Sequence, residues 1–257
     1  MVLAGKQGDK FQTIQQVLDV MTEKLLALQR NEDHRVVFHH VYLLMTKEMQ
    51  KRLSSGFFLD SDWMERVLVG FANFYFHAID AYEAGLPCPP AWDLAFRITS
   101  ENKGLVLLDA LLGINAHINS DLPVVMYEIL KEDQAWPDAR IMLRRHQDHN
   151  RINDVLKDLI DIVQDELALH YDRFIHLIDL LMGRRDESFA SFVLNHCRTN
   201  VWYNTELLLD ASDEDQRNFL RQQIENDAHT IGLKIADSRP LKFTKYLSFF
   251  TKKKRWL

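Results

Sequence analysis

The sequence predicts an all-α fold, a single-domain helical bundle of about 8–10 helices. Apolar residues recur at spacings of three and four along most of the 257-residue chain, which is the period of amphipathic helices. Glycine and proline are scarce, at 9 and 6 residues, and this disfavours the many tight turns of a β-protein. With 47% hydrophobic residues the chain can bury one sizeable core. We therefore expect one helical domain at residues 1–238 and a tail at 239–257.

Three helices are expected in the first third of the chain. The first, over residues 10–30, has a single apolar stripe. The second runs from about Asp33, a suitable N-cap, to a Ser-Ser-Gly stop after Leu53. The third begins near Asp60, ends at Gly85 and is rich in aromatic residues, which indicates a core element.

The remaining helices are predicted from apolar periodicity and start signals. The loop LPCPP leads to a short helix that begins at Pro90, and a nearly all-apolar helix follows at residues 104–122. After Pro123 a further helix continues to about Lys131. The later helices are expected at 137–170, 172–182 and 186–209, with a last helix capped by Ser212 and Asp215.

The segment at residues 115–123, NAHINSDLP, sets polar side chains directly after a continuous apolar run. The run at residues 104–114, GLVLLDALLGI, is apolar nearly all round a helix, which is typical of an element buried on every side. Buried polar groups need partners. Pro123 disfavours helical geometry at the residue before it, so we expect this central buried helix to kink or restart there.

The polar residues of this segment form two pairs at a spacing of four. His117 and Asp121 share one helical face, where they could chelate one metal ion or hold each other by a hydrogen bond. Asn115 and Asn119 form the second pair and are candidate binding residues. Alternatively, Asn119 or Asp121 caps the following helix and the other side chains form an internal hydrogen-bond network.

The long helix at residues 137–170 supplies candidate partners for these pairs. Steps of about 100° per residue from its apolar stripe place Arg145, Asp148 and His149 on the buried side. The alternative for these three is an internal salt bridge with a satisfied core histidine. The opposite side carries acidic residues that we expect in solvent: Asp154, Asp158, Asp161 and Asp165.

Two main function classes remain open. The first is a metal-dependent enzyme of the hydrolase type, acting on a phosphate ester or lipid, in which His117, Asp121 and His149 hold Zn, Fe or Mn. Asp148 would act as the base or orient a ligand, and Arg145 would bind an anionic group. The second is a non-catalytic helical binding module whose polar core fixes its packing. An isoprenoid- or lipid-processing enzyme without the usual aspartate-rich motif is a further alternative.

The rest of the sequence sets limits on localisation and partners. No apolar stretch reaches the roughly 18 residues that span a bilayer, and the start has no signal-peptide core, so we expect a cytoplasmic protein. The tail at 239–257 has basic and aromatic residues and no acid, which favours peripheral contact with an anionic membrane or a partner. Docking on the protein's own acidic surface is the alternative. The strongly acidic body at residues 1–238 would oppose a polyanion, so nucleic acid is not expected.

NAHINSDLP, preceded by LLDALLGI, resembles the hallmark of the bacterial domain of unknown function 5995 family. The similarity extends to PPAWDLAF (89–96), to the aromatic helix before it and to HNRINDVLKDLIDIVQ (149–164), so it covers about the middle half of the chain. The resemblance implies that His117, Asn119 and Asp121 belong to the family's pattern. It implies no activity.

Overall fold

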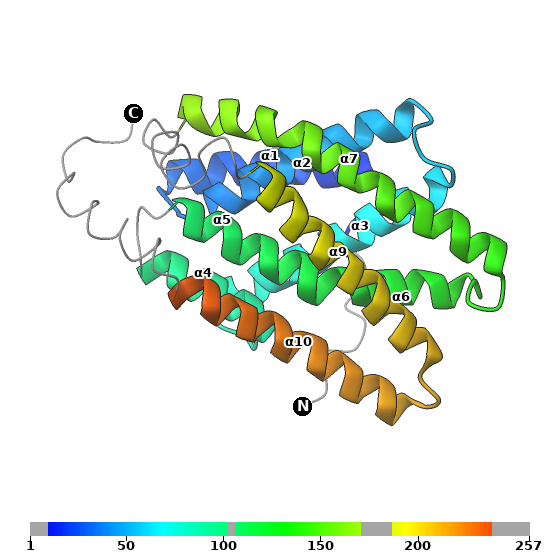
Figure 1. Cartoon of the computed structure of the whole chain (residues 1–257). Coiled ribbons are helices and arrows are strands. Elements are labelled where there is room, and N and C mark those ends of the chain that lie inside the picture. The colour runs from blue at the N-terminus through cyan, green and yellow to red at the C-terminus, as the bar shows by residue number, and fades with distance from the viewer. Residues whose placement is uncertain (1–9, 102–105, 171–186, 238–257) are drawn as a thin grey trace.

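The computed structural model is an all-α bundle built around one central helical run (Figure 1). It describes residues 10–101, 106–170 and 187–237, apart from the side chains of 106–107, 160–170 and 187–196. The helices are α1 (Ile14–Arg30), α2 (Val36–Ser54), α3 (Ser61–Glu83), α4 (Pro90–Glu101), α5 (Val106–Asn115), the π-helical segment η1 (Ala116–Asp121), α6 (Leu122–Glu132), α7 (Ala139–His170), α9 (Glu187–Asp210) and α10 (Glu214–Asp237). No strand occurs in these residues, so the predicted all-α fold is confirmed.

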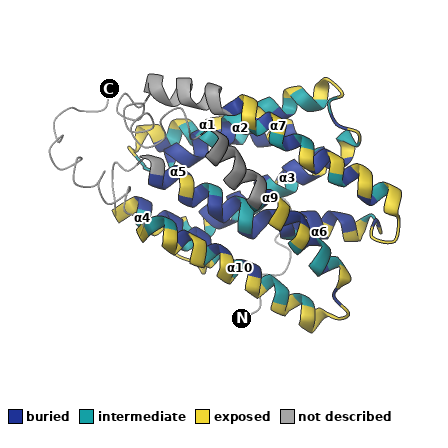
Figure 2. Cartoon of the chain, in the orientation of Figure 1, coloured by how far each residue is buried: buried dark blue, intermediate teal, exposed yellow. Residues whose placement is uncertain are grey.

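The central run consists of α5, η1 and α6, which follow one another without a break (Figure 1). Helix α5 packs against α2, α4 and α10, and α6 packs against α3 and α9. The segment η1 contacts α3, α4, α9 and α10. The outer faces of α7 and α10 are exposed, whereas α3 and α6 are largely buried (Figure 2). The fold therefore surrounds η1 with other helices.

Two apolar clusters meet at η1. The first joins α1 to α5 with α10 and includes Trp92, and the second joins α3, α6, α7 and α9 and includes Met126. Ala116, at the start of η1, belongs to the first cluster, and Leu122, just after its end, belongs to the second. Phe71 of α3 packs against both. The polar residues of η1 thus lie where the two clusters join.

Side-chain caps set several helix starts. Asp60 accepts a hydrogen bond from the backbone N–H of Trp63 at 3.2 Å and is the N-cap of α3, as its sequence position indicates. The predicted cap at Asp33 is wrong by a few residues. Its carboxylate accepts the backbone N–H of Arg35 at 2.9 Å and shapes the turn before α2, which begins at Val36.

Two expected segments lie outside the described residues: the helix at 172–182 and the basic tail at 239–257. The last described helix, α10, is capped by Asp213, which accepts the backbone N–H of Gln216 at 2.8 Å, rather than by Ser212. Within the part of the chain that the structure describes, no helix is both long and apolar enough to cross a bilayer.

Candidate functional site

Residues 116–121 form a single π-helical stretch in the middle of the buried run. The backbone N–H of Leu122 donates to the carbonyl of His117, five residues back, where an α-helix would bond four residues back. Pro123 then lies in the first turn of α6, where a missing N–H costs little. The expected disturbance is therefore a wider turn through which the helix continues. Such π-helical turns are rare and frequently lie at functional sites.

His117 and Asp121 face each other across this turn. Nδ1 of His117 lies 3.0 Å from Oδ2 of Asp121, and each side chain is buried. The same oxygen accepts a hydrogen bond from the indole N–H of Trp92 on α4 at 2.9 Å. Of the two arrangements that their spacing allows, the structure shows the hydrogen-bonded pair. Asp121 makes no side-chain capping bond to α6, so the alternative capping role does not occur there.

Burial favours the uncharged forms of both partners. It raises the pKa of Asp121 well above its ordinary value of 3.8, against the opposing effect of the Trp92 hydrogen bond. It lowers the pKa of His117 well below 6.5, so the imidazole is neutral at physiological pH. Because Oδ2 of Asp121 already accepts from Trp92 and lies next to Nδ1, we assign the imidazole proton to Nδ1. Nε2 is then the nitrogen with a free lone pair.

Five aromatic rings enclose the imidazole of His117. Phe71 lies flat against it, with ring centroids 3.3 Å apart and an interplanar angle of 3°. Tyr42 meets it edge-on at 4.5 Å between centroids. The other three rings have centroids within 6.0 Å of it: Phe38, Tyr75 and Trp92. We call these five rings and His117 the aromatic cage.

Nε2 of His117 is buried and has no hydrogen-bond partner among the described residues. Leaving a buried polar nitrogen unpaired costs about 1–3 kcal/mol. An apolar side chain at the same position would avoid this cost, so packing alone does not account for the histidine. The aromatic cage therefore holds a buried imidazole nitrogen that makes no hydrogen bond to the described residues.

Asn115 and Asn119 connect the central run to the outer helix α10. Nδ2 of Asn119 donates to Oδ1 of Asn115 at 3.0 Å, and Nδ2 of Asn115 donates to the carbonyl of Ala228 at 2.8 Å. Asn115 is buried and Asn119 is partly buried. The predicted pairing of the two amides is present in the structure. The contacts of Asn115 are made within the protein and hold α10 on the central run.

Asp148 on α7 binds backbone groups at the start of α3. Its two carboxylate oxygens accept the N–H groups of Leu59 at 2.8 Å and Asp60 at 2.7 Å. The side chain is fully buried, with 0% exposure. Both oxygens are thus occupied in fixing the connection between α2 and α3 on α7.

His149 forms a reciprocal contact with Arg198 on α9. Its Nε2–H donates to the carbonyl of Arg198 at 3.0 Å, and the guanidinium of Arg198 lies 3.1 Å from Nδ1 and donates to the carbonyl of His149. Burial lowers the pKa of His149 well below its ordinary value and that of Arg198 to about 9. Both ring nitrogens of His149 are therefore occupied by Arg198.

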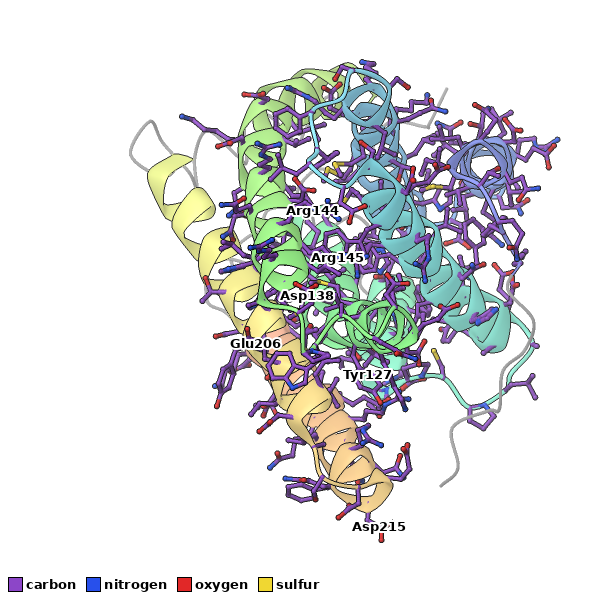
Figure 3. The ribbon with its side chains drawn as sticks, turned by 90° about the vertical axis from the view of Figure 1, so that its right-hand side faces the viewer. Tyr127, Asp138, Arg144, Arg145, Glu206 and Asp215 are labelled. Carbon is purple, nitrogen blue, oxygen red and sulfur yellow. The ribbon has the colours of Figure 1, made fainter. Side chains whose placement is uncertain are left out.

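Arg145 is compensated by two acids, one at the start of α3 and one at the end of α6. Its Nε lies 3.3 Å from Oδ2 of Asp60, and its Nη2 lies 2.7 Å from Oδ2 of Asp133. Figure 3 shows it next to Arg144, which is itself paired with Asp60 at 2.9 Å. The positive charge of Arg145 is thus taken up by ion pairs of the protein itself.

The structure brings His117 and Asp121 together but does not bring His149 to them. In residues 10–101, 106–170 and 187–237, no three or more His, Cys, Asp or Glu side chains are grouped so that they could hold a metal ion. A Zn, Fe or Mn centre at His117, Asp121 and His149 would require His149 to leave Arg198. The described geometry therefore gives this three-ligand centre no support.

Trp92 and Arg198 are the two partner residues that the sequence reading missed. Trp92 lies in PPAWDLAF, one of the segments that carry the family resemblance, and that was a usable signal. Arg198 carries no comparable signal, because a single arginine in an amphipathic helix is ordinary. Its role follows only from the packing of α9 on α7.

Comparison of the sequence with known proteins assigns the chain to a family. No curated protein and no solved structure matches it. The model of a family of unknown function, DUF5995, matches residues 14–238, which include η1, the aromatic cage and both helices that hold His149 and Arg198. This match covers most of the chain, and the protein belongs to this family of unknown function.

Proposed function

We propose that this protein is an acid–base enzyme for a small lipid-like or aromatic substrate, with the neutral imidazole of His117 as the general base. The observation that carries the proposal is the unpaired, buried Nε2 of a histidine whose other nitrogen is held by the carboxyl group of Asp121. A carboxylate at Nδ1 orients an imidazole and leaves its second nitrogen to take a proton. Trp92 would be a positioning residue, because it fixes the carboxylate from the opposite side.

The surroundings of His117 favour an uncharged or apolar substrate. The walls are aromatic, and Arg145, the residue first considered for binding an anion, is paired with Asp60 and Asp133. A phosphate ester would have to lose its hydration without gaining a free cation. A lipid-like ester is therefore the more suitable substrate class. His117 would take a proton from the water that attacks the acyl carbon and return it to the alkoxide oxygen that leaves when the ester C–O bond breaks.

Entry of a substrate requires one ring of the aromatic cage to move. Phe71 is the only one of the five that is partly buried rather than buried, and it covers the face of the imidazole. A rotation of Phe71 would open the space above His117. Phe71 is thus the ring that we expect to act as the gate.

Hydrolysis of 4-nitrophenyl hexanoate by the purified full chain tests this proposal. His117→Gln is expected to lower kcat by about 10²–10⁴-fold, the usual contribution of a general base. Asp121→Asn should lower it by a similar factor, because an amide NH2 facing Nδ1 favours the imidazole tautomer that is protonated at Nε2. Asp93→Asn, a change at a side chain of α4 that is 50% exposed, is the control and should leave the rate unchanged. Equal rates for the wild type and folded His117→Gln would contradict the proposal.

The second candidate is a non-catalytic binding module with a structural polar core. The observation that favours it is that the site is closed to solvent. His117 and Asp121 are each 3% exposed, and the hydrogen bond from Asn115 to the carbonyl of Ala228 holds α10 against η1. On this account His117→Phe raises the free energy of unfolding by about 1–3 kcal/mol, because it removes an unpaired buried nitrogen, and no reaction depends on the residue.

A further inference from the structure

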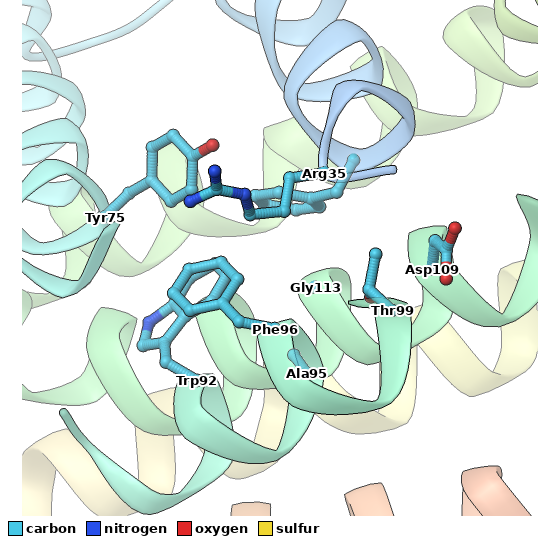
Figure 4. Close-up of a pocket in the computed structure, with 9 residues that line it drawn as sticks. Arg35, Tyr75, Trp92, Ala95, Phe96, Thr99, Asp109 and Gly113 are labelled. Carbon is cyan, nitrogen blue, oxygen red and sulfur yellow. The ribbon is translucent and has the colours of Figure 1, made fainter. Parts of the chain in front are cut away.

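Asp109 is a second buried acid, separate from the His117–Asp121 pair. It lies at the edge of a narrow cavity between α2, α4 and α5. The cavity has a volume of about 10 Å³, which is room for one water-sized group. Asp109 and Thr99 lie at one end, and Arg35 lies across the cavity from Phe96 (Figure 4). The rings of four residues form its apolar walls: Phe38, Tyr75, Trp92 and Phe96.

The carboxylate of Asp109 has no cationic partner of fixed charge in the described residues. Its side chain is 1% exposed, and neither oxygen has a hydrogen bond of good geometry. Nδ1 of His34 lies 4.0 Å from Oδ2, and the hydroxyl of Thr99 lies close by. A buried carboxylate in this state is unfavourable until a proton or another cation neutralises it.

Arg35 does not provide this charge, although it lines the same cavity. Its Nε donates to Asp33 at 2.9 Å, and its Nη1 lies 2.9 Å from Oε1 of Glu83. The guanidinium is therefore compensated by two other acids. Burial raises the pKa of Asp109 to about 8, and the negative charge of Asp33 adds to this effect. Below about pH 8 a proton neutralises the Asp109 carboxyl group, and once it ionises the cavity favours another cation in place of that proton.

The chemistry of the walls selects an ammonium group over a metal ion. Calcium takes roughly 6–8 oxygen ligands, whereas the side chains that line this cavity offer carboxylate or hydroxyl oxygens only at Asp109, Thr99 and Tyr75. An ammonium group can donate N–H bonds to the Asp109 carboxylate and rest its remaining surface on aromatic faces. A single ammonium group also has about the size of the water that the cavity would hold.

We propose that this cavity binds an ammonium group, either free ammonium or the head group of a small primary amine, with Asp109 as its counterion and Thr99 as a hydrogen-bond acceptor. The site is separate from the His117–Asp121 pair and does not depend on the function proposed for that pair. The two share the rings of Phe38, Tyr75 and Trp92 as a common wall.

Isothermal titration calorimetry of the full chain tests this proposal, at about pH 8.5 so that Asp109 is largely ionised. The probes are the chlorides of ammonium, methylammonium, potassium and tetramethylammonium, at equal ionic strength. We expect saturable binding of ammonium or methylammonium and at least tenfold weaker binding of the other two. Tighter binding of methylammonium identifies an amine head group as the ligand, and tighter binding of ammonium identifies the free ion. Equal heats from ammonium and potassium overturn the proposal.

Variants locate the bound cation. Asp109→Asn is expected to weaken ammonium binding at least tenfold, and Thr99→Val a few-fold. Asp93→Asn, which removes a half-exposed carboxylate from the same helix as Thr99, is the control and should bind as the wild type does. Wild-type affinity in Asp109→Asn overturns the proposal. If Asp109→Asn does not fold, Thr99→Val and the series of four cations on the wild type decide the question.

Discussion

The indole N–H of Trp92 and Oδ2 of Asp121 form a buried hydrogen bond of 2.9 Å between α4 and η1. The same oxygen lies 3.0 Å from Nδ1 of His117. The carboxylate is thus held from one side by the indole and holds the imidazole on the other. The orientation of His117, and with it the direction of its free Nε2, depends on this chain of three side chains.

Replacing Trp92 by Phe removes the donor and keeps most of the ring. We expect the free energy of unfolding to fall by about 1–3 kcal/mol, because Oδ2 loses one of its two contacts in a buried setting. The pKa of Asp121 should rise further, because the indole hydrogen bond acts to lower it. Denaturant unfolding and the carboxyl carbon resonance of Asp121 measure the two effects. Trp136→Phe, at an exposed position, is the control and should change stability by less than about 0.5 kcal/mol.

Asp148 is expected to act on stability rather than on turnover. Asp148→Ala leaves the part-buried N–H groups of Leu59 and Asp60 without their acceptor. The free energy of unfolding, measured by chemical denaturation, should fall by about 3 kcal/mol. Asp148→Asn retains one acceptor and should cost less. Asp154→Ala, on the exposed side of α7, should be near neutral. A folded, stable Asp148→Asn variant that has lost ester hydrolysis would restore a catalytic role to this residue.

His149→Ala should destabilise the protein by about 1–3 kcal/mol, because the buried Arg198 guanidinium loses the Nδ1 acceptor and keeps only the backbone carbonyl of residue 149. The double variant His149→Ala/Arg198→Met should recover part of this loss, since it also removes the buried charge. Elemental analysis of both proteins gives an independent check. Stoichiometric zinc, iron or manganese in the wild type that disappears in His149→Ala would contradict the role assigned to His149.

Asp109 makes stability depend on pH. Its folded pKa of about 8 lies above the model value of 3.8, so between these values the folded state keeps a proton that the unfolded state releases. The stabilising effect of this proton is complete below about pH 3.8 and is lost as the pH rises through 8. At pH 7 the loss is on the order of 4 kcal/mol.

Asp109→Asn should remove this dependence. Thermal unfolding of the variant is expected to give a higher Tm than the wild type at pH 8, with a smaller difference at pH near 4. Equal pH profiles of the two proteins would show that Asp109 titrates normally in the folded state. The measurement is made without ammonium salts, because a bound cation would offset the same charge.

The sequence carries enough information to predict which faces of the helices are buried. Steps of about 100° along α7 predict that Arg145, Asp148 and His149 point inward, and they are 7%, 0% and 2% exposed. The polar residues of NAHINSDLP are likewise placed in the interior by their apolar flanks. The periodicity of apolar residues predicts which face of a helix is buried, and the apolar residues on either side of a segment predict that the segment lies in the interior.

Periodicity does not give the partner across the interface. His149 meets Arg198 rather than Asp121 because α9 packs against both α7 and η1. No local sequence pattern encodes that packing. Pro123 indicates that a regular α-helix is disturbed but not that the disturbance is a π-helical turn. Asp109 is a charged residue inside the apolar run GLVLLDALLGI, and such a position indicates a buried charge.

The central claim is that His117 is neutral, protonated at Nδ1 and bare at Nε2. Proton–nitrogen correlation NMR of 15N-histidine-labelled protein measures this most directly, with His117→Gln to assign the signals. The account predicts an unprotonated Nε2 whose signal stays constant between about pH 5 and 8, because burial lowers the pKa well below its ordinary value. A protonated Nε2, or a His117 signal that titrates near pH 6.5, would contradict it.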